Sequence, residues 1–361
     1  MRLRHGGEIR LFSEKFGIPE QEILDFSSNI NPFGPPDSVK EAYESLAEEL
    51  QFYPDPEALE FRREVARHFP IFPENVIAGN GAIELLDLIL RFLRPRRALV
   101  IEPAFLEYRR LLNLQGAEIR SLSLREKDSF CFSLPELVNA LTGVDIAILA
   151  HPNNPTGTHL AREALRELLG EAKRRNIFVV LDEAFVDWSP ELSIAKEIRD
   201  DAFFFVARSL TKFFALPGIR IGYGLGSRKL IEKLATVQVP WSCNRLAQRL
   251  GTTALRDEAF ARASREWLAK ERDWLQFHLQ AIPWLKAYPS AANFLLIRQG
   301  SGSRGRSLLE EMGKQGICLR DLAEFSGLGS SYFRLAVRKR EDNMRLLETL
   351  RSAFVTPEKV V

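Results

Sequence analysis

The stretch Ile177-Phe-Val-Val-Leu-Asp-Glu-Ala-Phe185 passes from five apolar residues directly into two acidic ones. A short apolar run rich in β-branched and aromatic residues is typical of a buried strand. Asp182 and Glu183 follow where that strand ends. Because a buried carboxylate is costly unless a cation is paired with it, the stretch predicts either a structural ion pair or a binding site at the edge of a sheet.

Similar runs recur on both sides of this stretch and alternate with amphipathic helical patterns, such as Ile83 to Leu93 and Arg162 to Arg174. Alternating strands and helices indicate an α/β fold class with a mostly parallel central sheet flanked by helices. The other strands predicted for this sheet are 98–101, 145–150, 203–207 and 219–225. Ligands of open α/β sheets lie outside the carboxyl ends of the strands, so the residues that follow these strands should converge on one crevice.

The pattern changes on both sides of this central region. Asn29-Ile-Asn-Pro-Phe-Gly-Pro-Pro36 cannot form regular helix or central strand, and it predicts an extended arm that lines the crevice. After about residue 240, a charged helical stretch at 245–281 precedes strand-like runs and a final helix, which indicates a smaller α+β domain. We therefore divide the chain into an N-terminal arm at 1–39, a large domain at 40–255 and a small C-terminal domain at 256–361. The strand-like runs of the small domain are 293–297, 317–320 and 332–337.

Composition favours a small-molecule ligand. The chain has 361 residues, 45% of them hydrophobic, and its net charge of +2 gives no field that would attract nucleic acid or an anionic membrane surface. Cys131, Cys243 and Cys318 are far apart and form no CxxC pair, which suits reduced thiols. With no apolar run of membrane-spanning length and no signal-peptide pattern, the expected location is the cytoplasm.

Several other kinds of site find no support in the sequence. The run around Asp182 resembles the Mg²⁺-binding strand of P-loop ATPases, but the chain has no GxxxxGK[ST] loop to hold a triphosphate. Gly222-Tyr-Gly-Leu-Gly226 has its third glycine misplaced for a dinucleotide loop. The five histidines show no metal-ligand spacing, and we expect no metal.

Three side chains at the predicted strand ends suit an aldehyde cofactor with a pyridine ring. The amine of Lys212 can form a Schiff base, and Asp182 can keep a pyridine nitrogen protonated so that the ring accepts electrons. Asn154, in a Pro-Asn-Asn-Pro-Thr-Gly turn, can donate to a ring oxygen, although such a turn also forms for backbone reasons alone.

The sequence also predicts a phosphate-binding site. Gly79-Asn-Gly-Ala82 opens a predicted helix, so backbone N–H groups and the helix dipole would face an anion. Ser209 and Arg220 could add contacts. A tight turn is the other reading of these glycines.

These motifs resemble a known family. In chain order, Asn-Pro-Thr-Gly at 154–157, Asp-Glu-Ala at 182–184, Ser-x-x-Lys at 209–212 and Arg220 are similar to the motifs of class I and II aminotransferases, which are fold type I pyridoxal 5′-phosphate enzymes. The resemblance spans nearly the whole chain. Within this family, three stretches look most like the L-threonine-O-3-phosphate decarboxylases of cobalamin synthesis: His5-Gly-Gly7 with 25–34, then 208–220, and Val239-Pro-Trp-Ser-Cys-Asn244.

The resemblance implies a fold type I architecture and a role for each matched residue. Lys212 would carry pyridoxal 5′-phosphate as a Schiff base, with Asp182 at the pyridine nitrogen, Asn154 at the ring hydroxyl and Phe105 stacked on the ring. The residues implied at the cofactor phosphate are Gly81, Ala82, Ser209, Arg220 and, from a second subunit, Tyr53. A homodimer with shared active sites follows from the last of these.

The implied reaction is decarboxylation of L-threonine O-3-phosphate to (R)-1-amino-2-propanol O-2-phosphate. The residues implied at the substrate are His5, Gly6, Asn31, Asn154, Arg320 and Arg334, with two points left open: His5 could instead be a frayed terminus, and Arg334 could hold either carboxylate or phosphate. The alternative is an aminotransferase acting on a phosphorylated amino compound such as histidinol phosphate. Phe185 stands where many aminotransferases have tyrosine, which removes one hydrogen bond to the ring hydroxyl.

Overall fold

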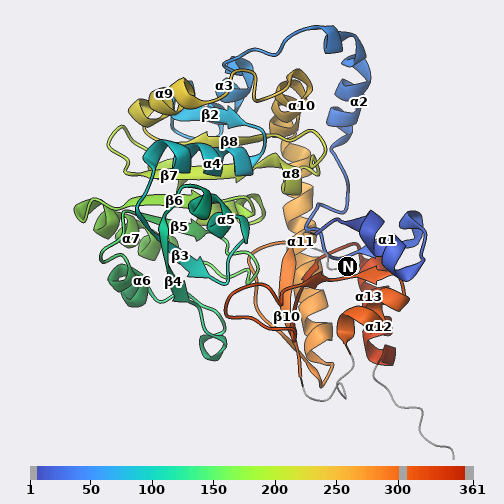
Figure 1. The fold of residues 1–361 in the computed structure, drawn as a ribbon. Helices are drawn as coiled ribbons and strands as arrows, with labels where there is room; N and C mark the ends of the chain where they lie inside the picture. Colours follow the sequence, from blue (N-terminus) through green and yellow to red (C-terminus); the bar gives the residue numbers. More distant parts are fainter. Residues whose placement is uncertain (1–5, 301–306, 354–361) are drawn as a thin grey trace, which may run out of the picture.

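A seven-stranded sheet forms the centre of the larger part of the molecule in the computed structural model, which describes residues 6–300 and 307–353. The strand order is β2-β8-β7-β6-β5-β3-β4 (Figure 1). Neighbouring strands from β7 to β4 are parallel, whereas β8 is antiparallel to both of its neighbours. The strands are β2 (Val76–Gly79), β3 (Arg97–Glu102), β4 (Glu118–Ser123), β5 (Ile146–Ala150), β6 (Phe178–Asp182), β7 (Phe204–Ser209) and β8 (Gly222–Leu225).

The apolar side chains of a single strand belong to two hydrophobic cores, one on each face of the sheet. Along β6, Val179 and Leu181 belong to one core and Val180 to the other, because successive side chains of a strand point to opposite faces. Helices cover both faces (Figure 1), so the inner strands such as β5 and β6 are continuous apolar runs rather than alternating ones. The helices are α1 (Ile9–Phe16), α2 (Asp37–Ser45), α3 (Leu59–Arg67), α4 (Ala82–Leu93), α5 (Glu107–Leu114), α6 (Leu134–Ala140), α7 (Arg162–Arg174), α8 (Leu210–Phe213), α9 (Arg228–Val237), α10 (Arg245–Arg256), α11 (Glu258–Gln280), α12 (Leu308–Lys314) and α13 (Arg340–Ala353).

A second sheet lies beside the long helix α11 (Figure 1). It is antiparallel, with the order β12-β13-β10-β9, and its strands are β9 (Leu285–Ala287), β10 (Phe294–Gln299), β12 (Arg320–Asp321) and β13 (Tyr332–Ala336). The seven-stranded sheet therefore uses residues 76–225 and the second sheet residues 285–336. The domain limits at 39/40 and 255/256 remain our proposal.

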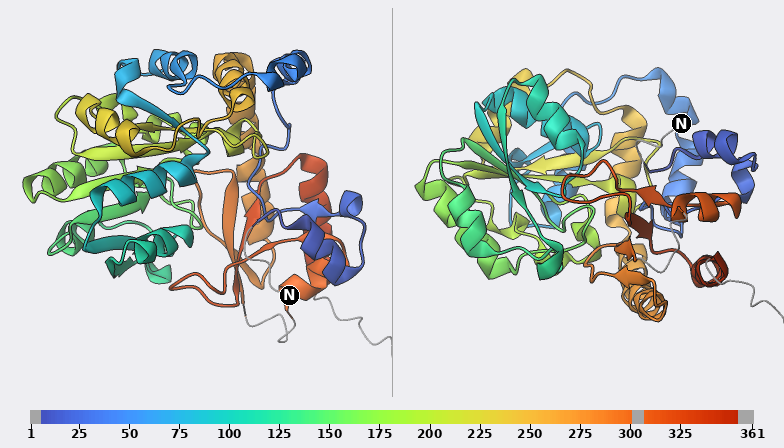
Figure 2. Two further views of the ribbon diagram at one scale, coloured as in Figure 1. Left: turned by 45° about the horizontal axis from the view of Figure 1, so that its top comes forward. Right: turned by 60° about the horizontal axis from the view of Figure 1, so that its bottom comes forward.

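The N-terminal segment is joined to the C-terminal part of the chain. Strand β1 (Leu24–Asp25) pairs in parallel with β11 (Ile317–Cys318), and α1 lies beside α12 (Figures 1 and 2). Residues 26–36 that follow β1 form neither helix nor strand, as expected for this Pro- and Gly-rich segment. The arm thus begins as an element of the small sheet region and continues as an irregular chain toward α2.

The predicted α/β class with a mostly parallel sheet is confirmed, and α7 begins and ends at the predicted residues. Strands β2 and β4 were not predicted. β2 is only four residues long, and β4 is an edge strand whose side chains are largely exposed, so neither carries a strong apolar signal. The helical stretch predicted at 245–281 divides at Asp257, whose carboxylate caps α11 by accepting from the Phe260 amide at 2.9 Å.

None of the described helices combines the length and the apolar character needed to cross a bilayer.

Candidate active site

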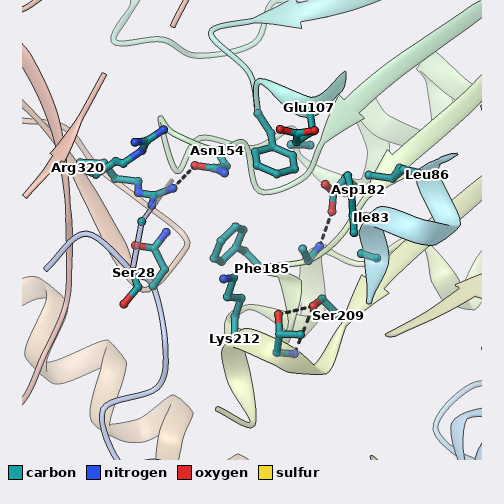
Figure 3. Close-up of a pocket in the computed structure, with 18 of the residues that line it drawn as sticks. Ser28, Ile83, Leu86, Glu107, Asn154, Asp182, Phe185, Ser209, Lys212 and Arg320 are labelled. Atoms are coloured by element: carbon teal, nitrogen blue, oxygen red, sulfur yellow. Dashed lines mark hydrogen bonds between the residues drawn. The ribbon is translucent and has the colours of Figure 1, made fainter. Parts of the chain in front are cut away.

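A cavity of about 420 Å³ opens at the carboxyl ends of β5, β6 and β7 and faces the small sheet (Figure 3). This is the edge of an α/β sheet where ligands bind. Ten of the residues predicted for the site line it: Gly6, Ala82, Phe105, Asn154, Asp182, Ser209, Lys212, Arg220, Arg320 and Arg334. The structure thus gathers into one space residues that lie hundreds of positions apart in the chain.

Lys212 lies on the short helix α8, directly after β7, and its side chain points into the cavity (Figure 3). The hydroxyl of Ser209 caps this helix by accepting from the Thr211 amide at 3.3 Å. The pKa of Lys212 is lowered to about 8, mainly by burial and also by the cations Arg334 and Arg220, while Asp25 acts in the opposite direction. An amine with a lowered pKa is more often neutral, which is the form that attacks an aldehyde.

Asp182 ends β6 and turns its carboxylate into the cavity from the opposite side (Figure 3). Burial raises its pKa, and hydrogen bonds from Tyr108 and the backbone of Ala184 lower it. The Tyr108 hydroxyl donates to Oδ2 at 2.6 Å and the Ala184 amide donates to Oδ1 at 2.9 Å. A buried carboxylate held in this way suits a cationic partner such as a protonated pyridine nitrogen.

Glu183, the neighbour of Asp182, points away from the cavity. Its carboxylate accepts from the Ser193 hydroxyl at 2.6 Å and the Ile194 amide at 3.0 Å, and it lies 3.7 Å from the buried guanidinium of Arg208. The ion-pair reading of this stretch therefore applies to Glu183, whereas Asp182 faces the cavity.

The first turn of α4 forms an anion cradle beside Arg220. Gly81 precedes the helix with φ of 77°, and a Cβ atom placed on it would lie 2.5 Å from Nη2 of Arg220. Only glycine allows this close approach of backbone and guanidinium. The backbone amides of α4, the helix dipole and Arg220 together suit a phosphate group, and Ser209 lines the same cavity.

Arg320 and Arg334 form a cationic wall on the other side of the cavity. They are directly opposite one another on β12 and β13, and both are buried. Burial lowers the pKa of Arg334 to about 9, with the charge of Arg320 acting in the same direction, and burial also lowers the pKa of Arg320. Two neighbouring buried cations favour an anionic ligand between them.

Arg334 also anchors the wall to the rest of the site. Its Nη1 donates to Oδ1 of Asn154 at 2.5 Å, and its Nη2 donates to the backbone oxygen of Ser27 at 2.8 Å. With its amide oxygen turned toward Arg334, Asn29 accepts from both Nε and Nη1 at 3.2 Å. Ser28 and Asn29, which follow β1, therefore line the cavity.

Asn31 does not occupy the position that we expected. Its amide nitrogen donates to the backbone of Phe213 and to the hydroxyl of Ser264, both at 2.9 Å, and its oxygen accepts from the Phe33 amide. These bonds turn the side chain toward the core behind the cavity. Asn29, two residues earlier in the same irregular segment, faces the cationic wall instead. The sequence could not predict which residue would face the wall, because the segment has no regular repeat.

Tyr53 lies outside the cavity of its own chain. The residue is 78% exposed, and its ring packs against Trp241 with ring centroids 5.3 Å apart. His5 lies outside the described residues. Gly81 forms the cradle next to the lining residues Ala82 and Arg220.

Sequence reasoning missed several residues of the site. Tyr108, Ser28, Asn29, Thr211 and Phe325 lie in the cavity wall or directly behind it. Tyr108 follows Phe105 by three residues, and that spacing places both on one face of a helix start. The spacing was a usable signal, whereas the loop residue Phe325 carried none.

Comparison with known proteins shows the family to which the chain belongs. A model of the family described as aminotransferase class I and II matches residues 21–350. This chain belongs to that family. Its fold and the chain order of its motifs are those of fold type I.

Three individual proteins show what the chain is similar to within this family. The chain is 38% identical over 353 residues to a threonine-phosphate decarboxylase of Salmonella typhimurium, which covers 97% of this chain and 96% of the relative. It is 30% identical over 356 residues to the adenosylcobalamin biosynthesis bifunctional protein CobDQ of Leptospira interrogans, covering 97% of this chain and 41% of that protein. Among solved structures, a histidinol-phosphate aminotransferase of Clostridium acetobutylicum has a TM-score of 0.85 at 29% identity, covering 91% of this chain and 98% of that one.

Proposed function

We propose that this protein is a pyridoxal 5′-phosphate enzyme that decarboxylates L-threonine O-3-phosphate to (R)-1-amino-2-propanol O-2-phosphate in cobalamin biosynthesis. The observation that carries the proposal is the presence of two separate anion sites in one cavity, the cradle at Gly81 and Arg220 and the wall of Arg320 and Arg334. One suits the phosphate of the cofactor and the other a phosphorylated substrate. The similarity to a threonine-phosphate decarboxylase over nearly the whole chain supports it further.

The cavity fits the cofactor. The cradle that a Cβ on Gly81 would fill suits its phosphate, Lys212 its aldehyde, Asp182 its pyridine nitrogen and Asn154 its ring hydroxyl. Phe105 would stack on the ring. When bound, pyridoxal phosphate accepts the electrons released as a bond at the substrate α-carbon breaks.

Residues of the chain would then orient the substrate. A decarboxylase must hold the bond between the α-carbon and the carboxylate perpendicular to the cofactor ring. We assign the substrate phosphate to Arg320 and Arg334, because these two buried guanidiniums are neighbours in the wall of the cavity and their charges favour an anion. Asn29, which accepts from Arg334, and Gly6 also line the cavity and would complete the pocket. With its phosphate held there, the substrate would leave its carboxylate unbound by either arginine.

An aminotransferase acting on histidinol phosphate is the second candidate, and the similarity to a solved histidinol-phosphate aminotransferase favours it. Such an enzyme would share almost every cofactor residue. Phe185 counts against it, because the ring lies in the cavity wall and packs on Phe294 at 5.0 Å, so no hydroxyl is supplied there.

We further propose that the protein is a homodimer in which Tyr53 reaches the cofactor phosphate of the other subunit. Tyr53 and Trp241 form an exposed aromatic pair, and both segments that carry them also expose Phe52 and Val239. An exposed apolar patch of this kind marks an interaction surface. We place the enzyme in the cytoplasm, where reducing conditions suit its three free cysteines.

The test is incubation of the purified, pyridoxal phosphate-loaded protein with L-threonine O-3-phosphate while CO₂ release is followed. A parallel assay measures amino transfer from histidinol phosphate to 2-oxoglutarate. Release of CO₂ without an amino acceptor is the expected result. Amino transfer without CO₂ would instead establish the second candidate.

A further inference from the structure

The hydroxyl of Tyr108 is the only side-chain donor to Asp182 among the described residues. We propose that Tyr108 is a positioning residue, whose hydroxyl keeps the Asp182 carboxylate ionised and fixed in direction so that it can hold a proton on the pyridine nitrogen. The inference rests on the proposed cofactor and adds a residue that the cavity wall alone does not reveal.

The immediate surroundings of Asp182 leave little else to stabilise its charge. The carboxylate is buried, and no described lysine, arginine or histidine forms an ion pair with it. One oxygen accepts from the Ala184 amide at 2.9 Å, and the other accepts from Tyr108 at 2.6 Å. Removing one donor from a buried carboxylate leaves part of its desolvation cost uncompensated. The protonated form of the carboxyl then becomes more stable relative to the ionised form.

The position of Tyr108 is itself fixed by packing. Tyr108 is 1% exposed and belongs to the core between the sheet and helices α4 and α5. The backbone amide of Tyr108 donates to the carbonyl oxygen of Phe105 at 3.1 Å, and the two rings meet edge to face at 5.7 Å. The residue expected to stack on the cofactor and the residue that holds Asp182 are therefore set by one turn of the chain.

The hydrogen of this bond stays on the tyrosine. Burial raises the pKa of Tyr108 well above its usual value, and the neighbouring Asp182 raises it further. The phenol is thus a neutral donor, and the carboxylate can only accept. Burial and loss of this donor would act in the same direction on Asp182, since both raise its pKa.

Tyr108→Phe tests the inference because it removes the hydroxyl and keeps the ring. The matched control is Tyr288→Phe, which removes a hydroxyl that donates to Glu126 at 2.7 Å outside the cavity. We expect Tyr108→Phe to bind pyridoxal phosphate about ten- to a hundredfold more weakly, the size of one hydrogen bond to a charged group. The absorbance of the bound cofactor should also titrate at a different pH, whereas the control should match the parent in both measurements.

A second measurement needs neither substrate nor cofactor. In the full-length chain labelled with ¹³C at the aspartate carboxyl carbons, the signal that Asp182→Asn removes should titrate at higher pH in Tyr108→Phe. A fluorinated tyrosine at position 108, a stronger donor, should move it to lower pH. Identical titrations in all three proteins would overturn the role of Tyr108. Failure of the parent protein to bind pyridoxal phosphate would overturn the proposed function instead, and the two failures are thereby distinguished.

Discussion

Nη1 of Arg334 lies 2.5 Å from Oδ1 of Asn154, and this hydrogen bond joins β13 of the small sheet to the turn that follows β5. The same guanidinium donates through Nη2 to the backbone of Ser27, 307 residues away in the chain. One side chain thus connects the small sheet, the large sheet and the N-terminal arm at the point where the substrate is proposed to bind.

Arg334→Lys should weaken substrate binding without removing the cofactor. Lysine keeps the charge but loses the planar guanidinium that is held by Asn154 and Ser27, so KM should rise about tenfold to a hundredfold. Steady-state kinetics with L-threonine O-3-phosphate measure this, and absorbance checks that the cofactor remains bound. Arg345→Lys, on the exposed side of α13, is the control. An unchanged KM in Arg334→Lys would remove the arginine from the substrate site.

Lys212 gives a pH dependence that can be measured directly. Its pKa is lowered to about 8, so the neutral amine predominates above that pH and falls about tenfold for each unit below it. Covalent capture of pyridoxal phosphate by cofactor-free protein should therefore accelerate as the pH rises through about 8. A midpoint near that of an ordinary lysine would contradict the assignment. Lys212→Ala should show no capture at any pH, whereas Lys229→Ala, in a separate hollow, should behave as the parent does.

Phe185→Tyr should shift the balance between the two candidate reactions. The new hydroxyl would stand where many aminotransferases place theirs, and it would add a hydrogen bond at the ring oxygen. We expect slower CO₂ release and more amino transfer per turnover, measured as the ratio of the two products. A ratio equal to that of the parent would show that Phe185 has no part in reaction choice. Tyr288→Phe again serves as the control for a change outside the cavity.

The buried pair behind the site should matter for stability. Glu183 is fully buried near Arg208, so Glu183→Ala leaves a buried guanidinium short of one anionic neighbour. The free energy of unfolding should fall by about 3 to 5 kcal/mol, read from denaturant midpoints. Glu14→Ala removes an exposed partner of Arg10 and should cause no measurable change. A similar effect of both variants would deny the buried pair its role.

Mixed dimers test the exchange of Tyr53. Lys212→Ala and Tyr53→Ala should each be inactive alone, because both sites of either homodimer lack one of the two residues. When the two are mixed, every mixed dimer should contain one intact site, so activity should return with subunit exchange. No recovery, although mixed dimers form, would place Tyr53 outside the shared site. Tyr43→Ala, also an exposed tyrosine, is the control partner in the mixture.

Much of the large sheet could be predicted because its strands are continuous apolar runs. Such runs mark β5, β6 and β7, and each ends at a residue of the site. The antiparallel direction of β8 could not be predicted, because strand direction depends on where the chain returns and not on the composition of the strand. The edge strand β4 has no alternating apolar pattern from which it could be recognised.

The site residues divide in the same way. Asp182, Ser209 and Lys212 follow predicted strands, and their meeting in one cavity could be foreseen from that position. Asn29 and Ser28 lie in an irregular segment, where the direction of each side chain depends on tertiary hydrogen bonds such as those of Asn31. Tyr108 was missed for another reason: a buried tyrosine on an amphipathic helix also fits a plain core position.

The pairing of β1 with β11 has a consequence for how the chain matures on the ribosome. Leu24 must wait for Ile317 before the two strands can join. At about 5 to 20 residues per second, that interval is roughly 15 to 60 s of synthesis. During this time the large sheet can fold, but β1 has no β11 to pair with and the cationic wall of Arg320 and Arg334 has not been synthesised. The nascent protein can therefore acquire its cofactor cradle well before it acquires a place for its substrate.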